Sequence, residues 1–216
     1  MKILFSTKTW EGDWKKILSG GFERKLEACD FAFNETLLVV NNTKQPRDLF
    51  DDVADNVLFV EDEAKKTLDF FGLQEASFKG GYVYSIAELA ELRYAHAEGF
   101  DYLVHYSSDA LSVKGDWISE GIKILEEQRD VWVVSPYSDV NEWHDETNRD
   151  QMFSDQCYLV RPKDFILEDY TLTDPELPEY PAHGGDSFER KMARILHKNK
   201  KYRYILTDYR YEHPAF

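Results

Sequence analysis

The chain has 216 residues, and 41 acidic side chains exceed 26 Lys and Arg side chains, so the formal net charge is −15. Hydrophobic residues make up 43% of the sequence and aromatic residues 15%, which is enough for one sizeable core and excludes a disordered or fibrous protein. The acidity disfavours general binding to nucleic acid or to an anionic membrane, because both depend on Lys and Arg. We expect one compact domain.

Signals for export or membrane insertion are missing from the sequence. There is no run of about 18 apolar residues, and the N-terminal stretch becomes polar after a few residues. We therefore expect a cytoplasmic protein without a transmembrane segment. The two cysteines, Cys29 and Cys157, lie far apart within expected core elements, which favours free buried thiols over a disulfide or a zinc site.

Strand and helix patterns alternate through the first 135 residues. Apolar runs typical of buried parallel strands occur at 2–5, 36–42, 57–61, 102–106 and 131–135. Helical periodicity occurs between them, at about 14–28, 62–71, 85–98 and 116–128. In the helix at 85–98, Ser85 is the expected N-cap, with Glu88 three residues on. The alternation predicts an α/β fold with a mostly parallel sheet flanked by helices.

The last third of the chain has a different rhythm. A strand is expected at 157–160, a helix at 187–198 and a final strand at 202–206. Polar segments separate these elements, and no linker marks a second domain.

Polar side chains follow several predicted strands, where open α/β sheets bind their ligands. Asp109 stands out, because a carboxylate at a strand end beside hydroxyls can hold a divalent metal against a diphosphate. It could equally cap the following turn. The polar strand-end residues are Ser6, Thr7, Lys8, Asn41, Asn42, Glu61, Ser107, Ser108 and Asp109.

The stretch GFDYLVHYSSDALSVKGDWI, residues 99–118, resembles the central strand and Asp-x-Asp motif of GT-A-type nucleotide-sugar glycosyltransferases. The resemblance implies a single GT-A-like (Rossmann-like) domain over 1–216, with a donor half at about 1–137 and an acceptor half at about 138–216. It also implies that Asp109 binds Mn²⁺ or Mg²⁺ bridging the donor's two phosphates. Ser107 stands where the family has its first Asp, which departs from the usual motif.

A second stretch, HGGDSFERKMARIL at 183–196, resembles the family's glycine loop and a helix with an acidic residue facing the acceptor. It implies Asp186 and Glu189 as candidates for the base that takes a proton from an acceptor hydroxyl. Helix capping and the helix dipole would also explain both acids. By the same resemblance, His213 completes the metal site, and the expected substrate contacts here are His183, Gly184 and Gly185.

Further contacts follow from position in the family. Trp10 could stack on the donor's base and Lys8 could meet a phosphate, with Asn41 similarly placed, although Trp10 could also pack under the next helix. MFSDQCYLVRPKDF, at 152–165, resembles a segment of some bacterial and phage-encoded sugar transferases, which makes Asp155 and Gln156 candidate acceptor contacts. An ordinary turn before a strand would also account for them. A sugar-stacking wall could come from Trp143, His144 and Tyr180.

The resemblance implies a hexosyl- or pentosyltransferase that moves a sugar from a nucleotide diphosphate sugar, with a UDP-sugar the expected donor, to a hydroxyl. The acceptor could be a glycan, a lipid-linked sugar or a modified DNA base, and the net charge disfavours DNA. Two alternatives stay open. A nucleotidyltransferase would normally carry a glycine-rich basic loop after the first strand, where 6–14 has one glycine and one lysine. A noncatalytic nucleotide-sugar-binding or scaffold protein would fit Ser107 in the metal motif.

Overall fold

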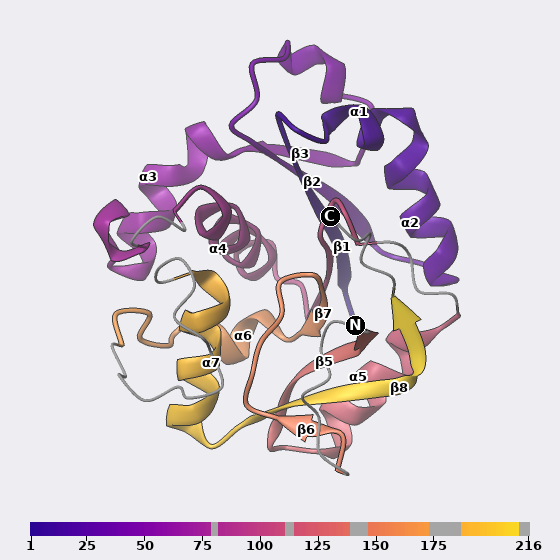
Figure 1. Cartoon of the computed structure of the whole chain (residues 1–216), viewed down its shortest axis with the longest axis vertical. Helices are drawn as coiled ribbons and strands as arrows, with labels where there is room; N and C mark the ends of the chain where they lie inside the picture. Colours follow the sequence, from indigo (N-terminus) through magenta and orange to yellow (C-terminus); the bar gives the residue numbers. More distant parts are fainter. Residues whose placement is uncertain (79–81, 111–114, 139–146, 173–186, 212–216) are drawn as a thin grey trace.

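The structure is a computed structural model that describes residues 1–78, 82–110, 115–138, 147–172 and 187–211. One eight-stranded sheet forms its centre, in the order β3-β2-β1-β4-β7-β5-β8-β6, and helices cover both faces (Figure 1). The strands are β1 (Ile3–Trp10), β2 (Glu35–Asn41), β3 (Asn56–Phe59), β4 (Tyr102–Tyr106), β5 (Val131–Ser138), β6 (Arg149–Asp150), β7 (Cys157–Val160) and β8 (Tyr202–Tyr211).

The sheet is mixed. Four of the seven pairings among the described strands are parallel, namely β1–β2, β1–β4, β2–β3 and β5–β8. Strand β7 runs antiparallel to both β4 and β5, and β6 runs antiparallel to β8. The expected α/β fold with flanking helices is confirmed, with β7 reversed near the middle of the sheet.

The reversal of β7 matters for the site. Tyr106, the last residue of β4, pairs with Cys157, the first residue of β7. The segment before β7 therefore lies beside the turn after β4, and the Ser107 amide donates a hydrogen bond to the Gln156 carbonyl over 2.7 Å. The residues just before β7 therefore lie next to the residues just after β4.

The helices form two layers around the sheet. One core lies between the sheet and α3, α4, α6 and α7, and the second lies between the sheet and α2 and α5. Successive strand residues point to opposite faces, so Leu4 belongs to the first core and Phe5 to the second. The helices are α1 (Trp14–Lys16), the π-helical turn η1 (Ile17–Gly21), α2 (Phe22–Cys29), η2 (Arg47–Phe50), α3 (Val60–Phe71), η3 (Glu75–Phe78), α4 (Tyr82–Ala97), α5 (Trp117–Glu127), α6 (Pro162–Phe165) and α7 (Phe188–Asn199).

Several sequence predictions agree with these bounds, and some do not. Strands β4 and β7 lie where they were expected, and Cys29 and Cys157 are free and buried. The expected loop after residue 5 is wrong, because β1 continues to Trp10 in register with β2. None of the helices within the described ranges is both long and apolar enough to cross a bilayer.

Two helix predictions are also corrected. The helix expected at 14–28 is broken in η1, where Gly20 has φ of +84°, a conformation that glycine adopts without steric penalty. Ser85 is not an N-cap, because α4 begins three residues earlier. Its hydroxyl instead accepts a hydrogen bond from the Phe188 amide over 2.8 Å, which ties α4 to the start of α7.

Candidate functional site

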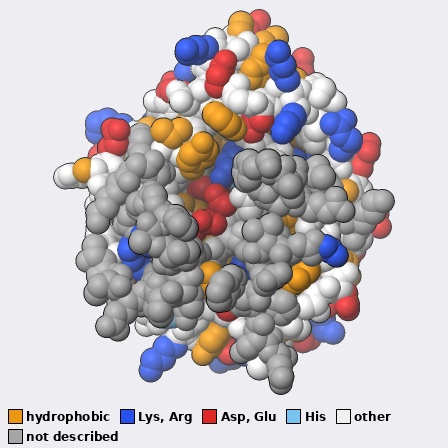
Figure 2. All heavy atoms as spheres, viewed as in Figure 1, with side chains coloured by type: hydrophobic (Ala, Val, Ile, Leu, Met, Phe, Trp, Pro, Cys, Tyr) orange, Lys and Arg blue, Asp and Glu red, His pale blue; other side chains and the backbone are white. Residues whose placement is uncertain are grey.

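A cavity of about 250 Å³ opens where β1, β2 and β4 end. Acidic and basic side chains gather near the middle of the face seen in Figure 1 (Figure 2). Eight of the ten described residues that line the cavity were candidates from the sequence, and Thr9 and Tyr84 are additional. The lining residues are Lys8, Thr9, Trp10, Asn41, Tyr84, Ser107, Ser108, Asp109, Asp155 and Gln156.

Two aromatic rings line part of this cavity. Trp10 ends β1 and is 42% exposed, and Tyr84, in the first turn of α4, is 51% exposed. Their ring centroids are 6.3 Å apart and the rings are nearly perpendicular, at 72°. The Asn41 amide donates to the Val83 carbonyl, which fixes the first turn of α4 against the end of β2. Accessible ring faces of this kind can stack on a flat ligand group such as a nucleobase.

The turn that carries Asp109 is held at both ends. The buried Lys25 of α2 donates to the backbone carbonyls of Ser107, over 3.0 Å, and of Ala110. The Ser107 hydroxyl lies 2.6 Å from Asp109 Oδ1 and 2.8 Å from Gln156 Oε1. Burial lowers the pKa of Lys25 to about 8. The position of Asp109 therefore depends on a lysine that reaches it from the opposite side of the turn.

A second contact ties this turn to the end of β1. The Ser108 hydroxyl donates to Oδ2 of Asp13, a buried carboxylate. The other oxygen of Asp13 accepts from the Thr9 hydroxyl over 2.7 Å and from the Trp10 amide over 2.8 Å. Asp13 thus joins the end of β1 to the turn after β4, and residues of both line the cavity.

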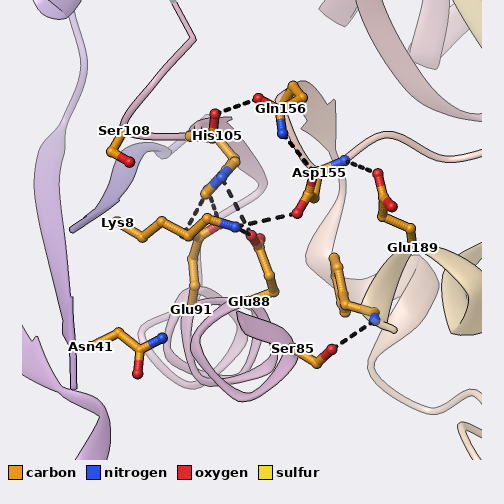
Figure 3. Close-up of polar contacts among 12 residues, drawn as sticks. Lys8, Asn41, Ser85, Glu88, Glu91, His105, Ser108, Asp155, Gln156 and Glu189 are labelled. Atoms are coloured by element: carbon orange, nitrogen blue, oxygen red, sulfur yellow. Dashed lines mark hydrogen bonds and ion pairs between the residues drawn. The ribbon is translucent and has the colours of Figure 1, made fainter. Parts of the chain in front are cut away.

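On the opposite wall, Lys8 forms a buried ion pair (Figure 3). Its ammonium donates to Glu88 Oε1 and lies 3.4 Å from Oδ2 of Asp155. Burial alone would lower the pKa of Lys8, but the charges of Glu88 and Asp155 outweigh it and raise the pKa above its ordinary value. Lys8 therefore presents a fixed positive charge to the cavity.

Behind Lys8 lies a second buried pair, formed by Glu91 and His105. Nδ1 of His105 is 2.8 Å from Glu91 Oε2, which also accepts from the Ser6 hydroxyl over 2.7 Å. Burial alone would lower the pKa of His105, but Glu88 and Glu91 raise it. Two carboxyl groups thus lie beside Lys8 and His105, and the Tyr158 hydroxyl bridges these carboxyl groups at 2.9 and 3.1 Å.

Asp155 also contacts Glu189 at the start of α7. The Asp155 amide donates to Glu189 Oε1 over 3.1 Å (Figure 3). Burial and the neighbouring Asp155 charge raise the pKa of Glu189 well above its usual range. Burial opposes ionisation of Asp155 too, but Lys8 and His105 lower its pKa. Asp155 is therefore the ionised member, and it is the member that lines the cavity.

No protein-family model matches the sequence, and no curated protein does. Solved structures do match. Glucosyl-3-phosphoglycerate synthase from Mycobacterium tuberculosis, in complex with Mn²⁺, UDP and phosphoglyceric acid, has a TM-score of 0.58 and 10% identity over 100% of this chain and 71% of that one. The fold is that of the GT-A nucleotide-sugar transferases.

Two further solved structures have a similar fold. A 1–349 fragment of S. aureus TarS in complex with UDP-GlcNAc has a TM-score of 0.55 and 14% identity, over 100% of this chain and 60% of that one. CMP:2-keto-3-deoxy-manno-octonic acid synthetase with CTP has a TM-score of 0.56 and 10% identity, over 96% of this chain and 90% of that one. At such identities the likeness establishes the fold alone, and the fold serves more than one reaction.

Two groups of side chains could hold a cation. Glu88, Glu91 and His105 bring their ligand atoms within 4.8 Å of one another. Glu88 is already bound by the Lys8 ammonium and Glu91 by the His105 ring, so both carboxyl groups of this buried group have partners without a metal. In the cavity, Asp109 offers the hard oxygen atoms that Mg²⁺ and Mn²⁺ prefer, so it suits such an ion, whereas Asp155 on the same wall is paired with Lys8.

The remaining sequence candidates fall into two groups. Ser6 and Thr7 are buried outside the cavity wall, where Ser6 binds Glu91 and the Thr7 hydroxyl donates to the Tyr106 carbonyl over 2.6 Å. Glu189 contacts the cavity only through Asp155. The candidates that lie outside the described residues are Trp143, His144, Tyr180, His183, Gly184, Gly185, Asp186 and His213.

Sequence reasoning missed the groups behind the cavity wall. A signal for two of them was present, because His105 sits in the middle of the apolar strand YLVHY and Glu91 lies between Ala90 and Leu92 of α4. A polar group in such a place must find a partner when it is buried. The missed residues are Asp13, Lys25, Glu88, Glu91 and His105.

Proposed function

We propose that the protein is a metal-assisted glycosyltransferase that moves a sugar from a nucleotide diphosphate sugar to a hydroxyl acceptor. The observation that carries the proposal is the cavity itself. Within the GT-A fold, it combines accessible aromatic rings, the Lys8 ammonium and the Asp109 carboxylate where β1, β2 and β4 end. Ligands of open α/β sheets bind at this edge.

The donor's nucleoside would occupy the part of the cavity near Trp10 and Tyr84. One ring can stack on the base while Asn41 keeps α4 and β2 in place around it. A UDP-sugar is the expected donor, and the UDP complexes of two structures with this fold support it. Lys8 would then bind an oxygen of the diphosphate with an ammonium that is already in position.

Mn²⁺ or Mg²⁺ would be held by Asp109, with oxygen atoms of Asp155 and Gln156 nearby. When bound, the ion would neutralise the diphosphate and stabilise it as it leaves. This chemistry suits the cavity, because its described wall has two carboxylates and one ammonium and would otherwise repel an anion. Lys25 and Ser107 hold the Asp109 turn in place before any ligand arrives.

The acceptor hydroxyl would approach Asp155, the ionised carboxylate of the wall. Its oxygens can accept a hydrogen bond from the hydroxyl and orient it, and the protonated Glu189 holds Asp155 from behind. Asp186 stays the alternative base for the proton. The acceptor proposed is a glycan, a lipid-linked sugar or a modified DNA base, in the cytoplasm.

Donor binding provides the test. The melting temperature is measured with UDP-, GDP- and CDP-sugars, with and without Mn²⁺, because ligands of the native state raise it. We expect a metal-dependent rise with one donor, its loss in Asp109→Asn, and its retention in Asp69→Asn, a control on the exposed face of α3. Release of nucleoside diphosphate from that donor then reports transfer. No rise with any donor would refute the proposal.

A nucleotidyltransferase is the second candidate, because the synthetase crystallised with CTP has the same fold and is covered over 90% of its length. The two reactions release different products. A nucleotidyltransferase frees pyrophosphate from a nucleoside triphosphate, whereas the glycosyltransferase frees a nucleoside diphosphate from a nucleotide sugar. Incubation with each nucleoside triphosphate and a panel of sugars, followed by a pyrophosphate assay, decides between them. Donor binding without either product would identify a binding protein.

A further inference from the structure

A second cavity, of about 280 Å³, lies beside η1 and α2. Its described lining includes three cations, Lys16, Arg24 and Lys25, and no carboxylate. This lining is basic, whereas in the whole chain acidic side chains outnumber basic ones by 41 to 26. We call it the basic cavity. Its wall carries a concentrated positive field in a protein whose overall field is negative.

The charge of Lys25 has no acidic partner in direct contact within the described part of the chain. Its side chain is almost fully buried, and the ammonium donates only to the carbonyls of Ser107 and Ala110. Carbonyl dipoles satisfy its hydrogen bonds, but they do not neutralise its charge. A buried charge is costly when no counter-ion accompanies it. The charges of Asp109 and Asp13 act on Lys25 without contacting it, and an anion in the basic cavity would add a counter-ion on the cavity side.

The backbone shapes the rim of the basic cavity. Gly20 has φ of +84°, and a Cβ at Gly21 would lie 2.3 Å from the Lys16 carbonyl oxygen, so neither position tolerates a side chain without rearrangement. The Arg24 guanidinium donates to the Ser19 carbonyl over 3.0 Å, which holds it at the rim. The break between α1 and α2 thus places Lys16 and Arg24 at the same cavity.

The basic cavity adjoins the first one. Ser108, next to Asp109 in the turn after β4, lines both cavities. Lys25 lines the basic cavity and at the same time fixes the turn that carries Asp109. A ligand in one cavity is therefore separated from a ligand in the other by a single turn.

We propose that the basic cavity binds a phosphate group at a site distinct from the donor cavity. A guanidinium matches two phosphate oxygens at once, and the ammonium groups of Lys16 and Lys25 balance the charge of a phosphate dianion. The phosphate belongs either to a phosphorylated acceptor, which would deepen the function proposed above, or to free phosphate in solution.

Calorimetric titration of the whole chain tests this site, with inorganic phosphate and glycerol 3-phosphate as probes at constant ionic strength. The double variant Lys16→Gln, Arg24→Gln removes two exposed cations, and Lys65→Gln, Lys66→Gln on α3 removes the same charge elsewhere. We expect one phosphate per chain, roughly 10-fold to 100-fold weaker binding in the first variant, and no change in the second. Equal weakening in both variants, or no binding to the wild type, would overturn the site.

Two further measurements complete the design. Acetylation of Lys16 by acetic anhydride, read by mass spectrometry, should be slowed by phosphate while that of Lys65 is not, which avoids any question of variant folding. Saturation with UDP and Mn²⁺ should leave phosphate binding intact, whereas one-for-one displacement would assign the phosphate to the donor cavity and refute the proposal. Tighter binding of glycerol 3-phosphate identifies a phosphorylated substrate, and equal binding identifies free phosphate. Failure of donor binding alone would leave this site standing.

Discussion

The ammonium of Lys8 lies 3.4 Å from the carboxylate of Asp155, although 147 residues separate the two along the chain. Lys8 belongs to β1, and Asp155 precedes the reversed strand β7. Glu88 of α4 binds the same ammonium from below the cavity. Acids from two other segments, Glu88 of α4 and Asp155 before β7, therefore depend on the one positive charge of Lys8.

Lys8→Met should lower the free energy of unfolding by about 3–5 kcal/mol, because it leaves the fully buried Glu88 carboxylate without its cation. Urea denaturation measures the loss. The double variant Lys8→Met, Glu88→Gln should recover much of it, since the fully buried position 88 then carries no unpaired charge. Lys65→Met, which breaks a surface pair with Asp69, serves as the control and should change stability little. Strictly additive effects at Lys8 and Glu88 would contradict the coupling.

Glu189→Gln should change how stability varies with pH. The pKa of Glu189 is raised in the folded protein, so the folded state holds this proton more tightly than the unfolded state. The stabilisation is complete below the unfolded-state pKa and is lost as pH rises through the folded-state pKa. Relative to wild type, Glu189→Gln should therefore gain stability as pH rises above about 4.5, by up to ~1.4 kcal/mol per pH unit. Urea denaturation of both proteins from acid to neutral pH measures the difference, and parallel pH profiles would disprove it.

Lys25→Met should weaken Mn²⁺-dependent donor binding, although Lys25 does not line the donor cavity. Loss of its ammonium leaves the carbonyls of Ser107 and Ala110 unsatisfied, at a cost of about 1–3 kcal/mol, and releases the turn that positions Asp109. Lys191→Met is a matched control, because Lys191 is a buried lysine of α7 that donates to the Tyr170 carbonyl. The control should lose stability yet keep its donor affinity. Equal donor affinities in the two variants would show that Lys25 does not contribute to donor binding.

Trp10→Ala should reduce donor affinity roughly 5-fold to 100-fold, the loss expected when an aromatic ring no longer stacks on a base. Because Trp10 is 42% exposed, its removal should leave the melting temperature without ligand nearly unchanged. Phe70→Ala on α3, where the ring is 49% exposed, is the control for losing an exposed aromatic ring. Fluorescence or calorimetric titration with the donor measures both, and an unchanged affinity in Trp10→Ala would place the base elsewhere.

Much of the fold followed from local patterns. Strands β4 and β7 are short apolar runs bounded by polar residues, and their bounds agree with those runs. The expectation that polar residues after strands lie together is also confirmed for residues distant in sequence, because Lys8, Asn41 and Asp109 line one cavity. This succeeded because parallel strands bring their carboxyl ends to one edge of a sheet.

The hydrogen-bond and ion-pair partners of these side chains could not be predicted from the sequence, because they depend on tertiary contacts. Ser85 and Glu88 have the spacing of a capping box, yet Ser85 binds the amide of Phe188 and Glu88 binds Lys8. The length of β1 was also underestimated, since polar residues such as Ser6 and Thr7 looked like a loop. Buried partners, Glu91 and the Tyr106 carbonyl, make those polar residues compatible with a strand.

The reversed strand β7 has a consequence for redesign. In the proposed function, donor contacts come from residues that end β1, β2 and β4, whereas Asp155 and Gln156 come from the segment that enters β7. The two sets are therefore carried by separate stretches of chain that meet at one edge. Exchanging the stretch between β6 and β7 for that of another protein with this fold should change acceptor choice while leaving the proposed contacts to the donor's base, at Trp10, in place. Under the proposed function, acceptor selectivity could then change without loss of the contacts to the donor's base.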